Sequence, residues 1–243
     1  MFERKKYKSF ALQQLKNRWT VPVLITLITT VILEIFNIPA VIRMLRNPDF
    51  IDLLNSDITD IYSYYESYSR ITNESSPLLS RLITAVVTGI LVMAGINVYL
   101  KMSRSPEKVS MGYFFEGFNL WARALLATLW KYLWVFLWSL LFLIPGIIKS
   151  IAYSQMFYIL NEYENVSVTK AMRISMLITN GHKWDLFVTH LSFIGWAILC
   201  CFTMGIGFFW LEPYINMTLT NAYHAMMKEA LVSGKLRPED LTE

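Results

Sequence analysis

The chain has 243 residues, of which 55% are hydrophobic and only 16% are charged, and its mean hydropathy is +0.40. A soluble domain usually carries about 25% charged residues, so this composition excludes an ordinary soluble protein and indicates that lipid covers much of the surface. The net charge of +4 is modest, and its distribution along the chain tells more than its size.

Several apolar segments approach the roughly 20 residues that a helix needs to cross a hydrocarbon core of ~30 Å. They are residues 19–42, 78–100, 121–144, 147–160, 184–202 and 208–227. Pro removes a backbone donor and Gly frees the backbone dihedrals, so we expect tight hairpin bends at Pro145 and Gly146 and at Gly205 and Gly207. The predicted fold is all-α: one integral membrane domain, residues 1–243, with six spans in three hairpins. The segment 147–160 is short, and a re-entrant hairpin is its main alternative.

Charge in the connecting segments predicts the orientation. Lys and Arg gather in residues 1–18, between the second and third segments, and between the fourth and fifth. The loop 43–77 instead carries six acidic residues against three arginines. Because basic loops stay in the cytoplasm, we expect both termini inside, including the tail 228–243, and the acidic loop outside.

A short amphipathic stretch precedes each hairpin. The apolar positions are Tyr7, Phe10, Ala11 and Leu15 in the first stretch, Met111, Phe114, Phe115 and Phe118 in the second, and Ala171, Ile174 and Ile178 in the third. We expect Ser167 to cap the third helix and Gly181 to end it. Such helices suit the cytoplasmic interface, where anionic lipids attract basic residues. The pattern favours a threefold repeat, although Trp and Lys mark the inner boundaries of any multispan protein.

Ionisable residues within spans are costly, and they are the candidate functional sites. They are Glu34, Arg81, Lys131, Lys149 and Glu212. Glu34 and Arg81 fall toward the outer ends of neighbouring spans and either pair or reach headgroups. Lys131 lies about 15 Å past Trp121 at 1.5 Å per residue, so it snorkels, finds a partner, or shows that the span begins later. Lys149 and Glu212 follow the two bends and are candidates for an ion pair or a substrate site.

No set of residues matches a catalytic, metal or nucleotide-binding motif. His190 lies near the inner boundary of the fifth segment, where a lone histidine is more often hydrogen-bonded to a neighbour than catalytic, and His182 and His224 are equally isolated. Cys200 and Cys201 alone cannot complete a zinc site. The sequence therefore predicts no cofactor, no metal, no nucleic-acid partner and no enzyme activity.

Residues of the second half resemble a family of bacterial integral membrane proteins catalogued as domain of unknown function 975. The resemblance rests on Trp138-Ser139, Leu143 to Lys149, Gly181 to Trp184, Leu191 to Trp196, Gly205-Ile206-Gly207 and Trp210 to Tyr214. It implies a multi-pass protein of the cytoplasmic membrane, from a Gram-positive bacterium. The family carries no established activity, so it assigns no functional residues.

Three classes of function remain open, of which an intramembrane or membrane-face enzyme is the least favoured. The absence of reactive groups favours a protein that acts by association, as a scaffold, accessory subunit or envelope-related factor with an unknown protein partner. The alternative is a transporter or lipid-handling protein that uses Lys149 and Glu212 near the outer face. The expected surroundings in both cases are the lipid bilayer, with anionic lipids at the cytoplasmic face.

Overall fold

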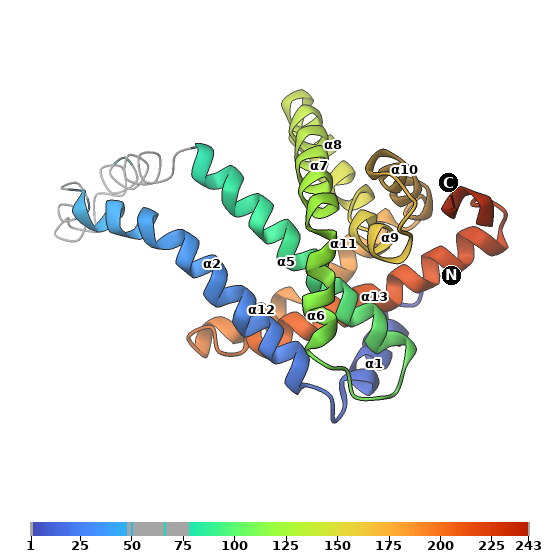
Figure 1. Ribbon diagram of the computed structural model, residues 1–243, viewed down its shortest axis with the longest axis horizontal. Coiled ribbons are helices and arrows are strands. Elements are labelled where there is room, and N and C mark those ends of the chain that lie inside the picture. Colours follow the sequence, from blue (N-terminus) through green and yellow to red (C-terminus); the bar gives the residue numbers. More distant parts are fainter. Residues whose placement is uncertain (1, 48–49, 51–65, 67–77, 243) are drawn as a thin grey trace. The chain divides into compact units, whose positions relative to one another are not determined.

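The computed structural model describes residues 2–47, 50, 66 and 78–242, and every regular element in this part of the chain is a helix (Figure 1). The first helices are α1 (Arg4–Leu15), α2 (Thr20–Arg46), α5 (Leu78–Arg104), α6 (Gly112–Gly117), η1 (Phe118–Leu120) and α7 (Trp121–Leu141). They are followed by α8 (Leu143–Ala152), α9 (Met156–Glu162), α10 (Val168–Ile178), α11 (Lys183–Leu191), α12 (Ile194–Phe202), α13 (Phe208–Val232) and η2 (Pro238–Leu241). Most of the predicted acidic loop, 43–77, lies outside the described residues.

The chain divides into two compact units. One unit comprises Met1–Leu27 and Gly89–Glu243, and the other comprises Ile28–Thr88. The second unit contains the later part of α2 and the beginning of α5. The first unit holds all other described helices, and the candidate site lies in it.

Five stretches are long and apolar enough to cross a membrane. They are Thr20–Arg43, Leu79–Arg104, Gly112–Leu141, Leu143–Glu162 and Lys183–Phe202. The membrane class is therefore supported, but the predicted sixth span, 208–227, is not among them. Its helix, α13, is long enough, yet it carries polar residues that lower the hydropathy, including Asn216, Asn221 and His224.

Two of these stretches are broken in the middle. Leu143–Glu162 is interrupted at residues 153–155, between α8 and α9, and Lys183–Phe202 is interrupted at residues 192–193, between α11 and α12. At 1.5 Å per residue the ten-residue α8 is about 15 Å long, half of a bilayer core. The chain after α7 therefore consists largely of half-length helices.

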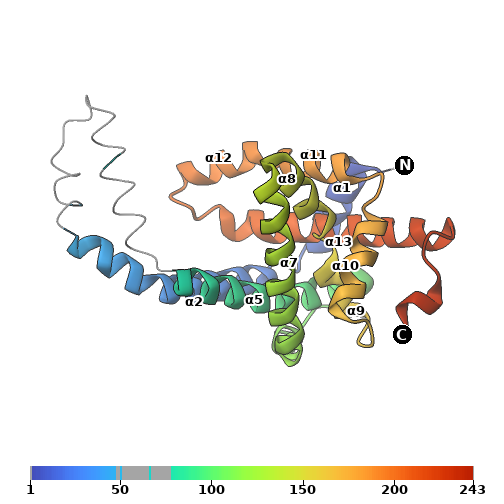
Figure 2. The same ribbon diagram turned by 90° about the horizontal axis from the view of Figure 1, so that it is seen from above.

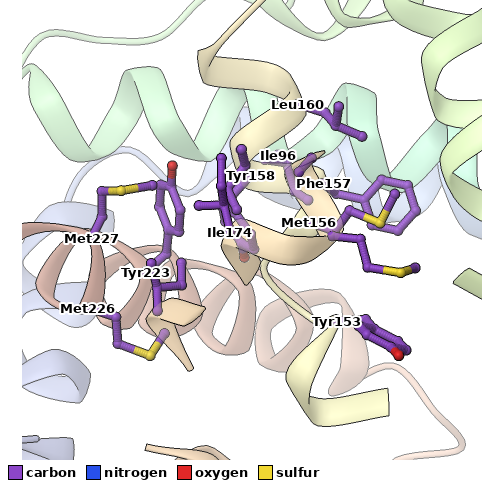
Figure 3. Close-up of a cluster of buried hydrophobic side chains, with 14 of the residues drawn as sticks. Ile96, Tyr153, Met156, Phe157, Tyr158, Leu160, Ile174, Tyr223, Met226 and Met227 are labelled. Atoms are coloured by element: carbon purple, nitrogen blue, oxygen red, sulfur yellow. The ribbon is translucent and has the colours of Figure 1, made fainter. Parts of the chain in front are cut away.

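The core of the first unit is centred on α9. All five residues from Met156 to Leu160 are buried, and Ile174 of α10 and Tyr223, Met226 and Met227 of α13 belong to the same cluster (Figure 3). Burial on every side of a seven-residue helix is typical of a protein interior rather than of a helix facing lipid.

The predicted amphipathic helices are present, and their apolar residues are largely covered by protein. α1 buries Tyr7, Ala11 and Leu15, and it lies beside α13 in both views (Figures 1 and 2). Phe10, the fourth predicted apolar position of this helix, is exposed instead. In the second stretch Phe114 is buried while Phe115 is exposed.

The third amphipathic helix follows the prediction closely. The Ser167 hydroxyl accepts a hydrogen bond from the Lys170 backbone N–H at 3.3 Å, which caps α10. Ala171, Ile174 and Ile178 are all buried. Gly181, which follows the helix, has a φ of +95°, a conformation that residues with a Cβ rarely adopt. Both predicted boundary signals are therefore confirmed.

The first hairpin bend differs in position from the prediction. α7 ends at Leu141 and Phe142 is extended, so the chain turns there, while Pro145 lies in the first turn of α8, where its missing N–H costs nothing. Gly146 has another role, because a Cβ there would lie 2.1 Å from Ser139 Oγ and 3.1 Å from Ser139 Cα. It lets α7 and α8 approach closely.

The second bend lies where the sequence predicts it. Gly205, in the turn between α12 and α13, has a φ of +86°. Gly207 is the N-cap residue of α13, and a Cβ there would lie 2.7 Å from Cys200 Sγ. One glycine therefore supplies the turn and the other the close approach of the two arms.

Candidate functional site

The most unusual polar group in the described structure is the carboxylate of Glu162, at the end of α9. Its side chain is only 7% exposed, and it forms an ion pair with Arg104, the last residue of α5. The hydroxyl of Tyr223 on α13 donates a hydrogen bond to its other oxygen. Both oxygens are therefore occupied, as a buried carboxylate requires. The three groups join the ends of α5 and α9 to α13.

Aromatic packing supports this contact. Tyr158, one turn before Glu162 on α9, stacks on Tyr223 with ring centroids 5.0 Å apart and planes inclined by 22°. Offset stacking of this kind is worth roughly 0.5–1.5 kcal/mol beyond the area buried.

Next to Glu162, burial raises the pKa of the Tyr163 hydroxyl, and the positive charge of Arg104 offsets part of that rise. The phenol stays neutral near pH 7.

The polar cluster continues from α5 and α13 to α1. Ser103 Oγ lies 2.8 Å from His224 Nε2. Gln14 donates to the Ser103 carbonyl at 3.2 Å and accepts a hydrogen bond from Asn221 Nδ2 at 2.8 Å. Together, Gln14, Ser103, Arg104, Glu162, Asn221, Tyr223 and His224 form what is called here the inner polar cluster.

Arg123, near the start of α7, holds the end of α9 from the other side. Its guanidinium donates to the carbonyls of Leu160 and Tyr163 at 3.0 Å and of Val166 at 2.5 Å. The last carbonyls of a helix have no intrahelical partner, and a planar, always charged donor satisfies several of them at once. The beginning of α7 is thereby fixed to the end of the hairpin arm that returns beside it.

Lys8 of α1 makes a comparable contact at the break between α11 and α12. Its ammonium lies 3.4 Å from the Ser192 carbonyl and 3.8 Å from the ring centre of Phe193. Burial, and secondarily the charge of Arg4, lower the pKa of Lys8. A cation at a helix C-terminus and over an aromatic face is favourable on both counts.

The ionisable residues that the sequence predicts within the hairpin spans have different surroundings in the structure. Lys131 lies over the ring of Phe157, 5.5 Å from its centre, and Lys149 lies over Trp138 at 4.5 Å. Glu212 is exposed on α13. Lys149 and Glu212 both belong to the described residues, and no ion pair joins them there.

Glu34 and Arg81 lie in the second unit, and both side chains are exposed. Glu34 is at a shallow pocket on α2 whose other lining residues are mostly aliphatic, among them Val31, Ile35 and Ile38. A carboxylate on this apolar surface is consistent with a position near headgroups, where it remains hydrated.

Each of the three histidines has a polar partner, as expected for His190 but not for His182 and His224. His224 contacts Ser103, His182 Nε2 lies 3.1 Å from Glu229 Oε1, and His190 Nδ1 lies 2.8 Å from the Leu186 carbonyl. Within the described residues, no group of three or more His, Cys, Asp or Glu side chains is placed to hold a metal ion.

Sequence reasoning missed Glu162 because it lies in a polar stretch read as a loop. A signal was nevertheless present: Arg104 and Glu162 each follow, by a few residues, the end of a predicted span that finishes in the cytoplasm. Opposite charges at ends on the same side of the membrane are candidates for pairing. Nothing local predicted that Tyr223, 61 residues later, completes the contact.

Comparison with known proteins identifies the family. The model of the family described as protein of unknown function DUF975 matches residues 1–151 and 140–230, so the chain belongs to this family. The resemblance seen in the second half therefore extends over nearly the whole chain. No curated protein and no solved structure matches.

Proposed function

We propose that the protein acts by association within the cytoplasmic membrane of a bacterium, as a scaffold, accessory or envelope-related factor rather than as an enzyme. The observation that carries the proposal is the use of its buried and half-buried polar groups. Glu162, Arg123 and Lys8 each join two helices, and in doing so they occupy the atoms that catalysis would need. The surface of the protein then remains as the part that binds a partner.

The same contacts support the proposed orientation, with both termini in the cytoplasm. The residues of the inner polar cluster come from α1, the end of α5, the end of α9 and the second half of α13. The charge distribution assigns each of these segments to the cytoplasmic side. Segments that are far apart in the chain thus meet on one side without any of them having to cross the bilayer.

The test is affinity capture in lipid nanodiscs, followed by mass spectrometry of the proteins and lipids retained. We expect a protein at fixed stoichiometry that captures this chain reciprocally and that is retained equally by Lys149→Ala and Glu212→Ala. A specific lipid or solute that is retained by the wild type and lost from either variant would contradict the proposal. That result would establish the alternative, a transporter or lipid-handling protein.

A further inference from the structure

Exposed apolar side chains in the first unit are concentrated on two arms. One arm is the hairpin of α7 and α8, and the other is the hairpin of α12 and the beginning of α13. By contrast, α9 and α10, and much of α1 and the second half of α13, are buried against one another. The unit thus has a packed base and two apolar arms. The base resembles a protein interior, and the arms resemble surfaces that face lipid.

The inner ends of both arms lie at the two helix breaks. At the α8–α9 break, Ser175 of α10 donates to the Ala152 carbonyl at 2.7 Å and accepts from the Gln155 N–H at 3.2 Å. At the α11–α12 break, Lys8 of α1 contacts the Ser192 carbonyl. The bridging side chains come from the two helices whose amphipathic sequences suit the cytoplasmic interface. The breaks therefore lie at the level of that interface.

Lys131 lies at the same level. Its ammonium contacts the ring of Phe157, which is the second residue of α9 after the break. If the hydrocarbon begins there, Lys131 is an interfacial lysine rather than a charge 15 Å deep. Its ammonium then stays hydrated, and the cost of burying a charge in hydrocarbon disappears. Only about ten residues of α7 and ten of α8 then remain beyond it, roughly 15 Å each. The nine residues of α12 reach a similar depth.

The two turns at the ends of the arms are apolar. All five residues from Leu140 to Ile144 are exposed, Phe142 by 73%, and in the other turn Phe202 is 81% and Met204 is 95% exposed. Leaving such a side chain in water carries a free-energy cost that grows with its apolar area. A turn that emerged into the aqueous phase would bear this cost several times over, whereas acyl chains around it remove the cost.

The arms also point away from the base in different directions (Figures 1 and 2). Two diverging hairpins cannot both stand upright in one bilayer, so at least one is tilted, and tilt reduces the depth that its tip reaches.

We infer that both arms are re-entrant: they enter the bilayer from the cytoplasmic face, turn within the hydrocarbon and return, with the tips at Phe142 and Met204 in contact with acyl chains. The inference rests on the membrane assignment and not on the proposed mode of action. It leaves both termini in the cytoplasm, and it explains why the arms are half-length, why their turns lack charge and why Lys131 is tolerated.

Thiol labelling tests the inference in intact cells. The background is the Cys200→Ala, Cys201→Ala double variant, in which single cysteines replace Phe142, Met204, Glu66 or Lys228. With a membrane-impermeant maleimide we expect Glu66→Cys, in the predicted outer loop, to react from outside. Lys228→Cys should react only in inside-out vesicles. Phe142→Cys and Met204→Cys should react in neither preparation, and only after unfolding in SDS.

A second measurement shows whether lipid or protein surrounds the tips of the two arms. A bimane on Phe142→Cys or Met204→Cys, reconstituted with lipids that carry nitroxides on their acyl chains, should be strongly quenched, while a bimane on Lys228→Cys should not. Labelling of either tip from outside would overturn the inference. So would tips that are shielded but not quenched, because protein, such as a second copy of this chain, would then cover them.

Discussion

Glu162 loses most of its contact with water when the chain folds. Its side chain is nearly fully buried, and the charge of Arg104 and the hydroxyl of Tyr223 replace the water that it loses. Arg104 is itself half exposed, so solvent screens the attraction and the pair is worth less than a fully buried one. The main effect of the contact is to lower the free energy of one packing arrangement of α5, α9 and α13 relative to other arrangements.

Removing Arg104 should therefore cost more than removing Glu162, because only Glu162 is nearly fully buried. We expect Arg104→Gln to lower the free energy of unfolding by about 1–3 kcal/mol, because it leaves a buried carboxylate without its cation. Glu162→Gln should cost less, since a neutral amide still accepts from Tyr223. In the double variant the losses should fall short of their sum, measured by unfolding in detergent micelles. Strict additivity would show that the two charges do not interact.

Some residue-level features were predictable because their causes are local. Ser167 caps α10, and Gly181 and Gly205 adopt positive φ, and each of these follows from a few neighbouring residues. Glu162 and Lys8 were not predictable, because their partners lie 61 and 184 residues away. A pattern along one helix carries no information about which carbonyl or hydroxyl a folded chain will bring beside it.

The α7–α8 hairpin depends on close contact between its two helices. Gly146 of α8 lies directly against Ser139 of α7, so that the backbones approach as in other small-residue contacts between membrane helices. Without a hydrophobic driving force between helices in lipid, such packing is a main source of stability.

A methyl group at this contact should separate the two helices. We expect Gly146→Ala to lower the free energy of unfolding by about 1–3 kcal/mol, the usual range for overpacking. Gly195→Ala is the matched control, because a Cβ there meets nothing within 4 Å. Thermal unfolding followed by tryptophan fluorescence would compare the two variants. Equal midpoints would mean that α7 and α8 do not pack closely at this glycine.

The apolar segments were largely predictable, and their interruptions were not. Length and hydropathy located five of the six expected stretches. The breaks at residues 153–155 and 192–193 escaped notice because they carry no Pro or Gly, the usual signals. They are stabilised instead by Ser175 and Lys8, which come from other helices. The sixth span stays a prediction: polar residues of α13 contact α1 and α5, and they lower the hydropathy of a helix that is otherwise long enough to cross a membrane.

At the scale of the whole molecule, the charge distribution and the contacts agree. Basic segments before α2, after α5 and around α10 and α11 contribute to one packed base, as expected if all lie on the same side of the membrane. The threefold repeat stays a prediction. α1 and α10 both contact a helix break, but the second amphipathic stretch, α6, instead packs closely against Ala94 of α5 through Gly117.

Reporter fusions test the orientation. A fluorescent protein fused after Glu243 should be fluorescent, because that end is predicted to be cytoplasmic. An alkaline phosphatase inserted at Glu66 should be active, because the enzyme matures only outside the cytoplasm. The same phosphatase fused at Gly234 is the control and should be inactive. Phosphatase activity at Gly234 would invert the orientation and with it the cytoplasmic placement of the inner polar cluster.

The pairing of α1 with α13 has a consequence for biosynthesis. Asn221 reaches back to Gln14 and to the Tyr7 carbonyl, so α1 finds its partner only after α13, about 200 residues later in the chain, has been made. Until then Tyr7, Ala11 and Leu15 are without their final cover. A nascent chain stalled before residue 208 would therefore expose the apolar face of α1 to chaperones and membrane proteases. These factors would then recognise chains that lack α13.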